Sequence, residues 1–122
     1  MKVLVVDDSG VMRRIHRNTL EENKVAEGDI LEAEDGEAAL TIAQSEDIGI
    51  FLLDWNMPKI NGLEFVKRIR IIDKYKETPI FMITSEAAKY NVVEAVKAGV
   101  TNYIIKPIQG NMLWEKIGKY FT

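Results

Sequence analysis

The stretch IGIFLLD at residues 48–54 is an almost wholly apolar run that ends in a carboxylate. Continuous runs of this kind are typical of parallel strands that are covered on both faces. Three further runs have the same form: 3–6 before Asp7 and Asp8, 80–83 before Thr84, and 103–105 before Lys106. The pattern predicts buried strands that each end in a polar side chain.

Helix-like segments separate these runs. Strands are expected near 3–7, 29–33, 48–54, 79–84 and 101–105, and helices near 10–23, 36–45, 61–72, 87–98 and 110–120. Asp35 is expected to cap one helix, Asn61 with Glu64 to form a capping box, and Gly99 to end a helix. The repeated alternation predicts one α/β domain, a doubly wound parallel sheet with right-handed crossovers.

The polar residues that follow the strands would meet at one edge of such a sheet. Ligands of open α/β sheets bind outside the carboxyl ends of the strands. Carboxylates such as Asp7, Asp8 and Asp54 suit Mg²⁺. The hydroxyl of Thr84 and the ammonium of Lys106 suit phosphoryl oxygens. The residues therefore predict a magnesium and phosphoryl site rather than a hydrophobic pocket.

Each of these residues also has a simpler interpretation. The two acids after the first strand could form a solvated turn, with Asp8 or Ser9 capping the helix. Asp54 and Thr84 could be helix N-caps. Lys106 could be a surface cation, unless a cis bond to the following proline turns it inward. The constellation is more specific than any of its members.

Composition excludes several classes of function. The chain has 122 residues, of which 47% are hydrophobic, and a net charge of −3, so we expect no binding to nucleic acid or to an anionic membrane. The absence of cysteine excludes disulfides and thiolate sites. No phosphate-binding glycine loop is present, which argues against a P-loop nucleotidase. Without a signal peptide or a membrane-length apolar run, we expect a cytoplasmic monomer.

Asp7-Asp8, Asp54, Thr84 and Lys106, in this order and at this spacing, resemble the response-regulator receiver domain over the whole chain. The resemblance implies a flavodoxin-like five-stranded parallel sheet of order 2-1-3-4-5. Because the chain ends one helix after Lys106, we expect a single stand-alone domain (residues 1–122) without an output domain.

Further motifs are most similar to the single-domain chemotaxis regulators of this family. They are DWNMP at 54–58, Asn61-Gly62, TSEA at 84–87, Tyr103 and Lys106-Pro107. Ile108 departs from the family pattern, where phenylalanine often follows the Lys-Pro pair, and is expected to change only packing. His16, the sole histidine, is expected to be packed or half-exposed rather than catalytic.

The resemblance implies that Asp54 is the phosphoacceptor for a histidine kinase of the chemotaxis type. Asp8, Asp54 and the backbone carbonyl of Asn56 would hold Mg²⁺, and Asp7 would contact the ion through water. Lys106 and Thr84 would bind phosphoryl oxygens. Beyond taking a phosphoryl group from a donor and losing it by hydrolysis, the protein is not expected to be an enzyme.

The resemblance also implies how the signal is passed on. Tyr103 would swing inward when Thr84 moves toward the phosphoryl group. Asn56 and Glu86 would set the rate of dephosphorylation. The expected partner is a flagellar motor switch protein or another effector, and the candidate contacts are Tyr90, Lys97, Tyr103 and Lys116. Tyr90, together with Trp114, is expected to be exposed or packed only at an edge.

Two other functions remain open from the sequence. A phosphorelay intermediate would pass its phosphoryl group on to a histidine phosphotransfer protein. A small phosphatase would turn over phosphomonoesters steadily, but the sequence offers no substrate pocket for one.

Overall fold

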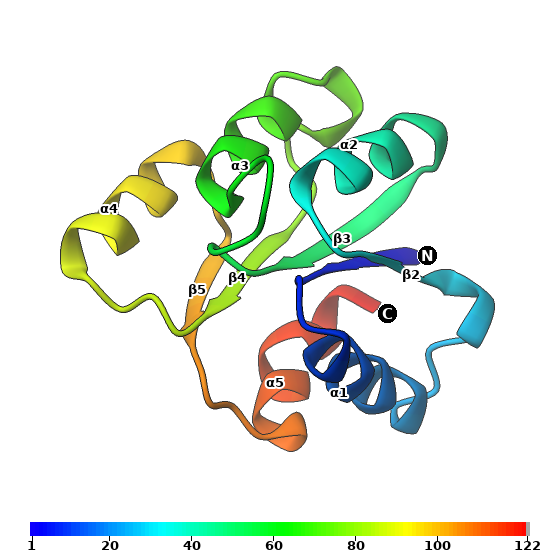
Figure 1. The fold of residues 1–122 in the computed structure, drawn as a ribbon. Helices are drawn as coiled ribbons and strands as arrows, with labels where there is room; N and C mark the ends of the chain where they lie inside the picture. Colours follow the sequence, from blue (N-terminus) through cyan, green and yellow to red (C-terminus); the bar gives the residue numbers. More distant parts are fainter. Residues whose placement is uncertain (122) are drawn as a thin grey trace.

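A computed structural model describes residues 1–121 as a five-stranded parallel sheet with helices on both faces (Figure 1). The strands are β1 (Lys2–Val6), β2 (Ile30–Ala33), β3 (Ile48–Leu53), β4 (Ile80–Thr84) and β5 (Asn102–Ile105). Their order is β2-β1-β3-β4-β5, and every neighbouring pair is parallel. The predicted fold class and strand order are confirmed.

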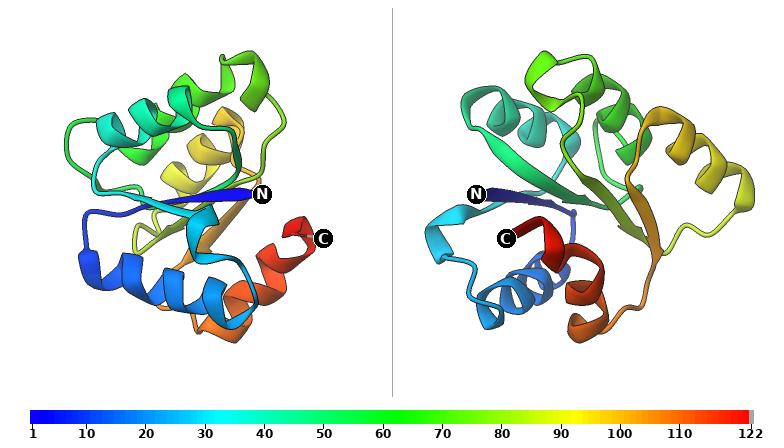
Figure 2. Two further views of the ribbon diagram at one scale, coloured as in Figure 1. Left: turned by 90° about the vertical axis from the view of Figure 1, so that its right-hand side faces the viewer. Right: turned by 180° about the vertical axis from the view of Figure 1, so that it is seen from behind.

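Five α-helices follow the strands in turn. They are α1 (Gly10–Glu22), α2 (Gly36–Ser45), α3 (Gly62–Arg70), α4 (Lys89–Ala98) and α5 (Gly110–Ile117). Short 3₁₀ turns lie at η1 (Glu27–Asp29), η2 (Asp73–Tyr75) and η3 (Gly118–Phe121). Helices α1 and α5 cover one face of the sheet, and α2, α3 and α4 cover the other (Figures 1 and 2).

The alternation of side chains along the strands divides the apolar interior into two cores. In β1, Leu4 and Val6 belong to the core under α2, α3 and α4, whereas Val3 and Val5 belong to the core under α1 and α5. Each of these side chains is almost completely buried. A strand that is buried on both faces has no polar alternation, which is why the sequence shows continuous apolar runs.

Three residues at helix ends were expected to act as caps, and the structure shows how each one ends or begins its helix. Asn61 accepts a hydrogen bond from the Glu64 amide and so precedes α3 as its N-cap. Asp35 caps α2 in the same way, through the Ala38 amide. Gly99 ends α4 with φ of 112°, a conformation that favours glycine. The caps at Asp35, Asn61 and Gly99 are confirmed, but the capping box is only half formed, because the Glu64 carboxylate accepts from Arg68 Nε (3.1 Å).

Four expected helices are shorter than predicted. The helix expected over 10–23 ends at Glu22, and the helix expected over 61–72 runs from Gly62 to Arg70. The helix expected over 87–98 begins only at Lys89, because the Glu86 amide is bonded to the Thr84 hydroxyl and residues 85–88 form a loop. The helix expected over 110–120 tightens into the 3₁₀ turn η3 after Ile117. Among residues 1–121, no helix is long and apolar enough to cross a membrane.

Candidate functional site

Three carboxylates meet at the carboxyl edge of the central strands. Asp7 and Asp8 follow β1, and Asp54 follows β3. Backbone hydrogen bonds from the Asp7 amide to the Ala33 carbonyl (3.1 Å) and from the Asp54 amide to the Val6 carbonyl (3.0 Å) continue the sheet into this site. One oxygen of each of the three carboxylates lies within 4.8 Å of the others. The sheet thus holds acids together that would repel one another in water.

The three acids differ in their exposure to solvent. Asp7 is 2% exposed and Asp54 is 8% exposed, whereas Asp8 is open to solvent. Ser9, not Asp8, caps α1, since its hydroxyl accepts a hydrogen bond from the Met12 amide (3.2 Å). Asp8 is therefore not used as the helix cap and keeps its place in the acid cluster.

Lys106, which follows β5, places its ammonium between the two buried acids. Its Nζ lies 2.9 Å from Asp7 Oδ2 and 3.2 Å from Asp54 Oδ2. The Lys106–Pro107 peptide bond is cis. Burial by itself lowers the pKa of Lys106, but the hydrogen bond to Asp7 and the charge of Asp54 outweigh it, and the pKa is raised. Lys106 is thus a half-buried, protonated group within the site, not a surface cation.

The acid cluster has the composition of a magnesium site. One ammonium balances only part of the charge of three carboxylates, and oxygen ligands with room for water suit Mg²⁺. The Asn56 amide lies 3.4 Å from Asp54 Oδ1, which brings the loop after β3 back over the cluster. The Gly62 amide closes this loop on the Trp55 carbonyl (2.8 Å). The residues expected to hold the ion are therefore adjacent.

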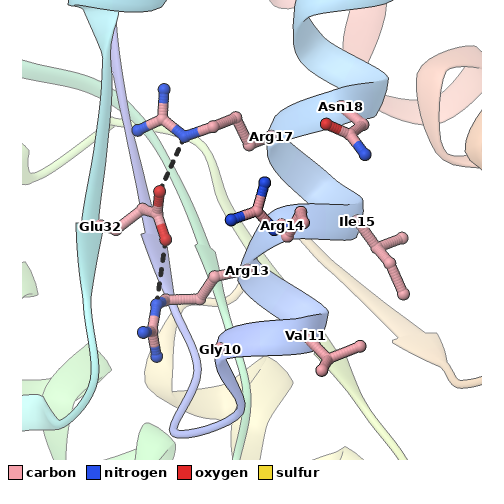
Figure 3. A pocket seen from close by; sticks show the side chains of 8 residues that line it. All are labelled: Gly10, Val11, Arg13, Arg14, Ile15, Arg17, Asn18 and Glu32. Carbon is pink, nitrogen blue, oxygen red and sulfur yellow. Dashed lines mark hydrogen bonds and ion pairs between the residues drawn. The ribbon is translucent and has the colours of Figure 1, made fainter.

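Hydrogen bonds of Arg13 orient Asp7, and they were not predicted from the sequence. Arg13 Nη1 donates to the Asp7 carbonyl (2.7 Å), and Arg13 Nε donates to Glu32 of β2 (3.0 Å). Arg17 Nε donates to the other oxygen of Glu32 (2.7 Å), so two arginines of α1 grip one carboxylate (Figure 3). The available signal was Glu32 itself, a charged residue within a strand.

Thr84 and Tyr103 are linked through Glu86. The Thr84 hydroxyl is fully buried and accepts from the Glu86 amide (3.2 Å). The Tyr103 hydroxyl donates to the Glu86 carbonyl (2.6 Å), and its partly buried ring packs against the core under α2, α3 and α4. Burial, with the charges of Glu86 and Asp54, raises the pKa of Tyr103 to about 12. Since α4 starts at Lys89, Thr84 is not a helix cap.

The candidate partner contacts lie on α4, β5 and α5, at one edge of the sheet (Figure 2). Tyr90 is 73% exposed, Lys97 and Lys116 are exposed, and Tyr103 is half-buried. Trp114 is half-buried against Phe121, with ring centroids 5.2 Å apart, so it is the edge-packed member of the predicted pair.

Two further residues lie in the core on the α1 and α5 side. Ile108 is partly buried and packs there, as expected for a change that affects packing only. His16 is 4% exposed, and within residues 1–121 its Nδ1 has no hydrogen-bond partner. Burial lowers the pKa of His16, and the charge of Lys106 lowers it further.

Comparison with known proteins agrees with this geometry. The family described as "response regulator receiver domain" matches residues 3–118. A "Chemotaxis protein CheY homolog" of Campylobacter jejuni is 50% identical over 96% of this chain and 89% of its own length. "Chemotaxis protein CheY1" of Helicobacter pylori is 49% identical over 96% of this chain and 94% of its own. The solved structure of chemotaxis response regulator CheY4 of Vibrio cholerae is 34% identical, with a TM-score of 0.89 over 98% of this chain and 97% of its own.

Proposed function

This chain belongs to the response regulator receiver domain family, and we propose that it is a switch in which Asp54 accepts a phosphoryl group from a histidine kinase. One observation carries the proposal. The Lys106 ammonium lies between the carboxylates of Asp7 and Asp54, beside an acid cluster of the composition that Mg²⁺ prefers.

The proposed reaction is a phosphoryl transfer to a carboxylate. An Asp54 carboxylate oxygen forms a bond to phosphorus while the bond from phosphorus to the donor breaks, and the donor keeps that electron pair. The product is an acyl phosphate. Lys106 is protonated and within reach, so its ammonium can bind a phosphoryl oxygen as negative charge accumulates. The Thr84 hydroxyl would bind a second oxygen after leaving the Glu86 amide.

The residues present fit a magnesium ion. Asp8, Asp54 and the Asn56 carbonyl would hold it, and Asp7 would contact it through water. When bound, the ion would supply positive charge that offsets the charge of the phosphoryl group. Lys106 alone balances too little of that charge, which is why we propose that the reaction depends on the metal.

The proposed output is a change in affinity for a protein partner. Movement of Thr84 toward the phosphoryl group would break its bond to the Glu86 amide and shift the loop that holds Tyr103. The face formed by α4, β5 and α5 would then bind differently to its target. Because the relatives at about 50% identity are named as chemotaxis proteins, we propose a chemotaxis role, with a flagellar motor switch protein as the partner.

The proposal is tested by labelling with acetyl phosphate. With magnesium, the intact mass should increase by one phosphoryl group, and chelation of the metal should prevent the increase. Asp54→Asn should abolish labelling, whereas Asp73→Asn, which removes an almost fully exposed acid, should leave it intact. Persistent labelling of Asp54→Asn would show that the phosphoacceptor is a different residue.

A further inference from the structure

The loop between β3 and α3 contains a strained lysine. Lys59 has φ of 70°, and within residues 1–121 only Lys24 shares a positive φ among the residues other than glycine. The Ile60 amide donates to the Pro58 carbonyl (2.8 Å), which closes a three-residue turn around Lys59. A γ-turn with positive φ at its centre is rare and strained. Strain of this kind persists only where the surroundings impose it, commonly at functional sites.

Packing against α2 imposes this conformation. A side chain at Gly36 would collide with the Ile60 carbonyl, so the loop lies directly on the first turn of α2. The Lys59 ammonium lies 3.8 Å from Asp35 Oδ2. The other oxygen of Asp35 caps α2 through the Ala38 amide (2.7 Å). The turn therefore directs the ammonium toward the loop after β2 while its side chain stays 58% exposed.

The ammonium lines a hollow that opens beside the acid cluster. The hollow has a volume of about 430 Å³ and is lined by Asp8, Glu34, Asp35, Pro58 and Lys59. Asp8 belongs both to this hollow and to the candidate magnesium site. Lys59 is the only cation among the lining residues, and three of the other lining residues are acids. The other cation of the site, Lys106, is already held between Asp7 and Asp54.

We infer that Lys59 is a specificity-determining residue that favours phosphodonors of higher net negative charge. This inference rests on the proposed function, because it concerns access to Asp54. A dianion that approaches this edge meets the carboxylates around the hollow, and the Lys59 ammonium among them lowers the repulsion. The effect acts through space and is weakened by salt. It should therefore grow with the charge of the donor and shrink as ionic strength rises.

A purely structural role for Lys59 makes a different prediction. If the ion pair with Asp35 only stabilised the loop, its loss would alter stability and slow labelling by all donors equally. The dependence on donor charge separates the two roles, because only an electrostatic role makes the reduction in labelling rate depend on the charge of the donor. The positive charge of Lys59 also opposes magnesium binding by the nearby acids, so removal of this charge should raise their affinity for magnesium. Rates are therefore compared at saturating magnesium.

The test measures labelling of Asp54 by two small donors at low ionic strength. Acetyl phosphate is a dianion at neutral pH, and phosphoramidate carries less negative charge. Lys59→Glu should slow labelling by acetyl phosphate about threefold or more, slow phosphoramidate less, and lose most of this difference in high salt. Lys59→Asn removes the charge but places at this position a residue that tolerates a positive φ, and it should show about half of the effect. Lys59→Arg should retain the parent rates.

Lys24→Glu is the matched control. Lys24 is an exposed lysine with φ of 71°, and it follows the far end of α1, away from the acid cluster. The same charge reversal there should leave both rates at the parent value. Equal slowing of labelling by both donors in Lys59→Asn, or no slowing in Lys59→Glu and Lys59→Asn, would overturn the inference while Asp54 is still labelled. Absence of labelling in the parent would instead overturn the proposed function.

Discussion

The Tyr103 hydroxyl donates a 2.6 Å hydrogen bond to the backbone carbonyl of Glu86. The amide of Glu86 in turn donates to the Thr84 hydroxyl. A single residue of the loop before α4 thus joins the end of β4 to the middle of β5. Any force that moves Thr84 must act on the same peptide segment that holds Tyr103. This connection gives a physical route from the acid cluster to the proposed partner face.

Burial of the Tyr103 hydroxyl, with the nearby charges of Glu86 and Asp54, predicts a late phenol titration. Its pKa is raised from 10.0 to about 12, so the neutral phenol stabilises the folded state below pH 10, and this contribution is lost between pH 10 and 12. Absorbance of phenolate should show a late titration step that belongs to Tyr103. Tyr103→Phe should remove that step and cost about 1 kcal/mol at neutral pH. A titration curve above pH 10 that Tyr103→Phe leaves unchanged would contradict this environment.

Magnesium should stabilise the folded protein, because the assembled acids exist only in the native state. At ten times the dissociation constant, binding adds about 1.4 kcal/mol to the free energy of unfolding. Asp8→Asn should be at least as stable as the parent without metal, since it relieves repulsion, and should lose most of the gain with metal. Thermal unfolding with and without magnesium measures both quantities.

Glu22→Gln is the control for the magnesium experiment. Glu22 is an exposed acid at the far end of α1, and its change alters net charge equally. This variant should keep the full response to magnesium. If Asp8→Asn and Glu22→Gln respond alike, the stabilisation is a general salt effect rather than binding at the acid cluster.

The fold was predictable because its strands are buried on both faces. Runs such as 48–53 have no polar alternation, and the helices between them begin at side chains such as Asp35 and Asn61 that bond the first free amides. The members of the acid cluster were predictable for a related reason. Residues after parallel strands lie at one edge whatever the details of the loops.

The contacts that tune the site were not predictable in the same way. The hydrogen bonds from Arg13 and Arg17 to Glu32 depend on how α1 lies across β2, and no local sequence pattern specifies that packing. The bond from Tyr103 to Glu86 depends on the loop 85–88, in which residues 87 and 88 were expected to begin the helix. The positive φ of Lys59 arises from packing against α2, because lysine has no intrinsic preference for that conformation.

His16 should make the protein less stable as the pH falls. Its pKa is lowered by burial and by Lys106, against the opposing charges of Asp7 and Asp54. The unfolded chain therefore takes up a proton first, and stability declines as the pH falls below about 6.5, by at most about 1.4 kcal/mol per pH unit. Urea unfolding of the parent and of His16→Leu at pH 7.5 and 5.5 measures the difference. Equal losses of unfolding free energy between pH 7.5 and 5.5 in the parent and in His16→Leu would exclude His16 as the source of the pH dependence.

The phosphoryl group on Asp54 should be short-lived because water can reach it. Asn56 is exposed, and Glu86 is half-buried with one carboxylate oxygen bonded to the Ala88 amide (3.1 Å). Neither side chain is bulky or apolar, so neither blocks an in-line water. Asn56→Met should therefore slow phosphoryl loss, and a tenfold change corresponds to about 1.4 kcal/mol in the barrier.

Glu86 offers a second way to vary the same rate. Glu86→Leu should also slow hydrolysis, because it removes a carboxylate able to orient the water while leaving the backbone groups that bond Thr84 and Tyr103 in place. The rate is followed by mass spectrometry after the donor is removed. Asp54 must still be labelled in both variants, which separates slower hydrolysis from failed phosphorylation. A parent phosphoprotein that persists for hours, or decay that neither Asn56→Met nor Glu86→Leu alters, would show that these side chains do not control access of water to Asp54.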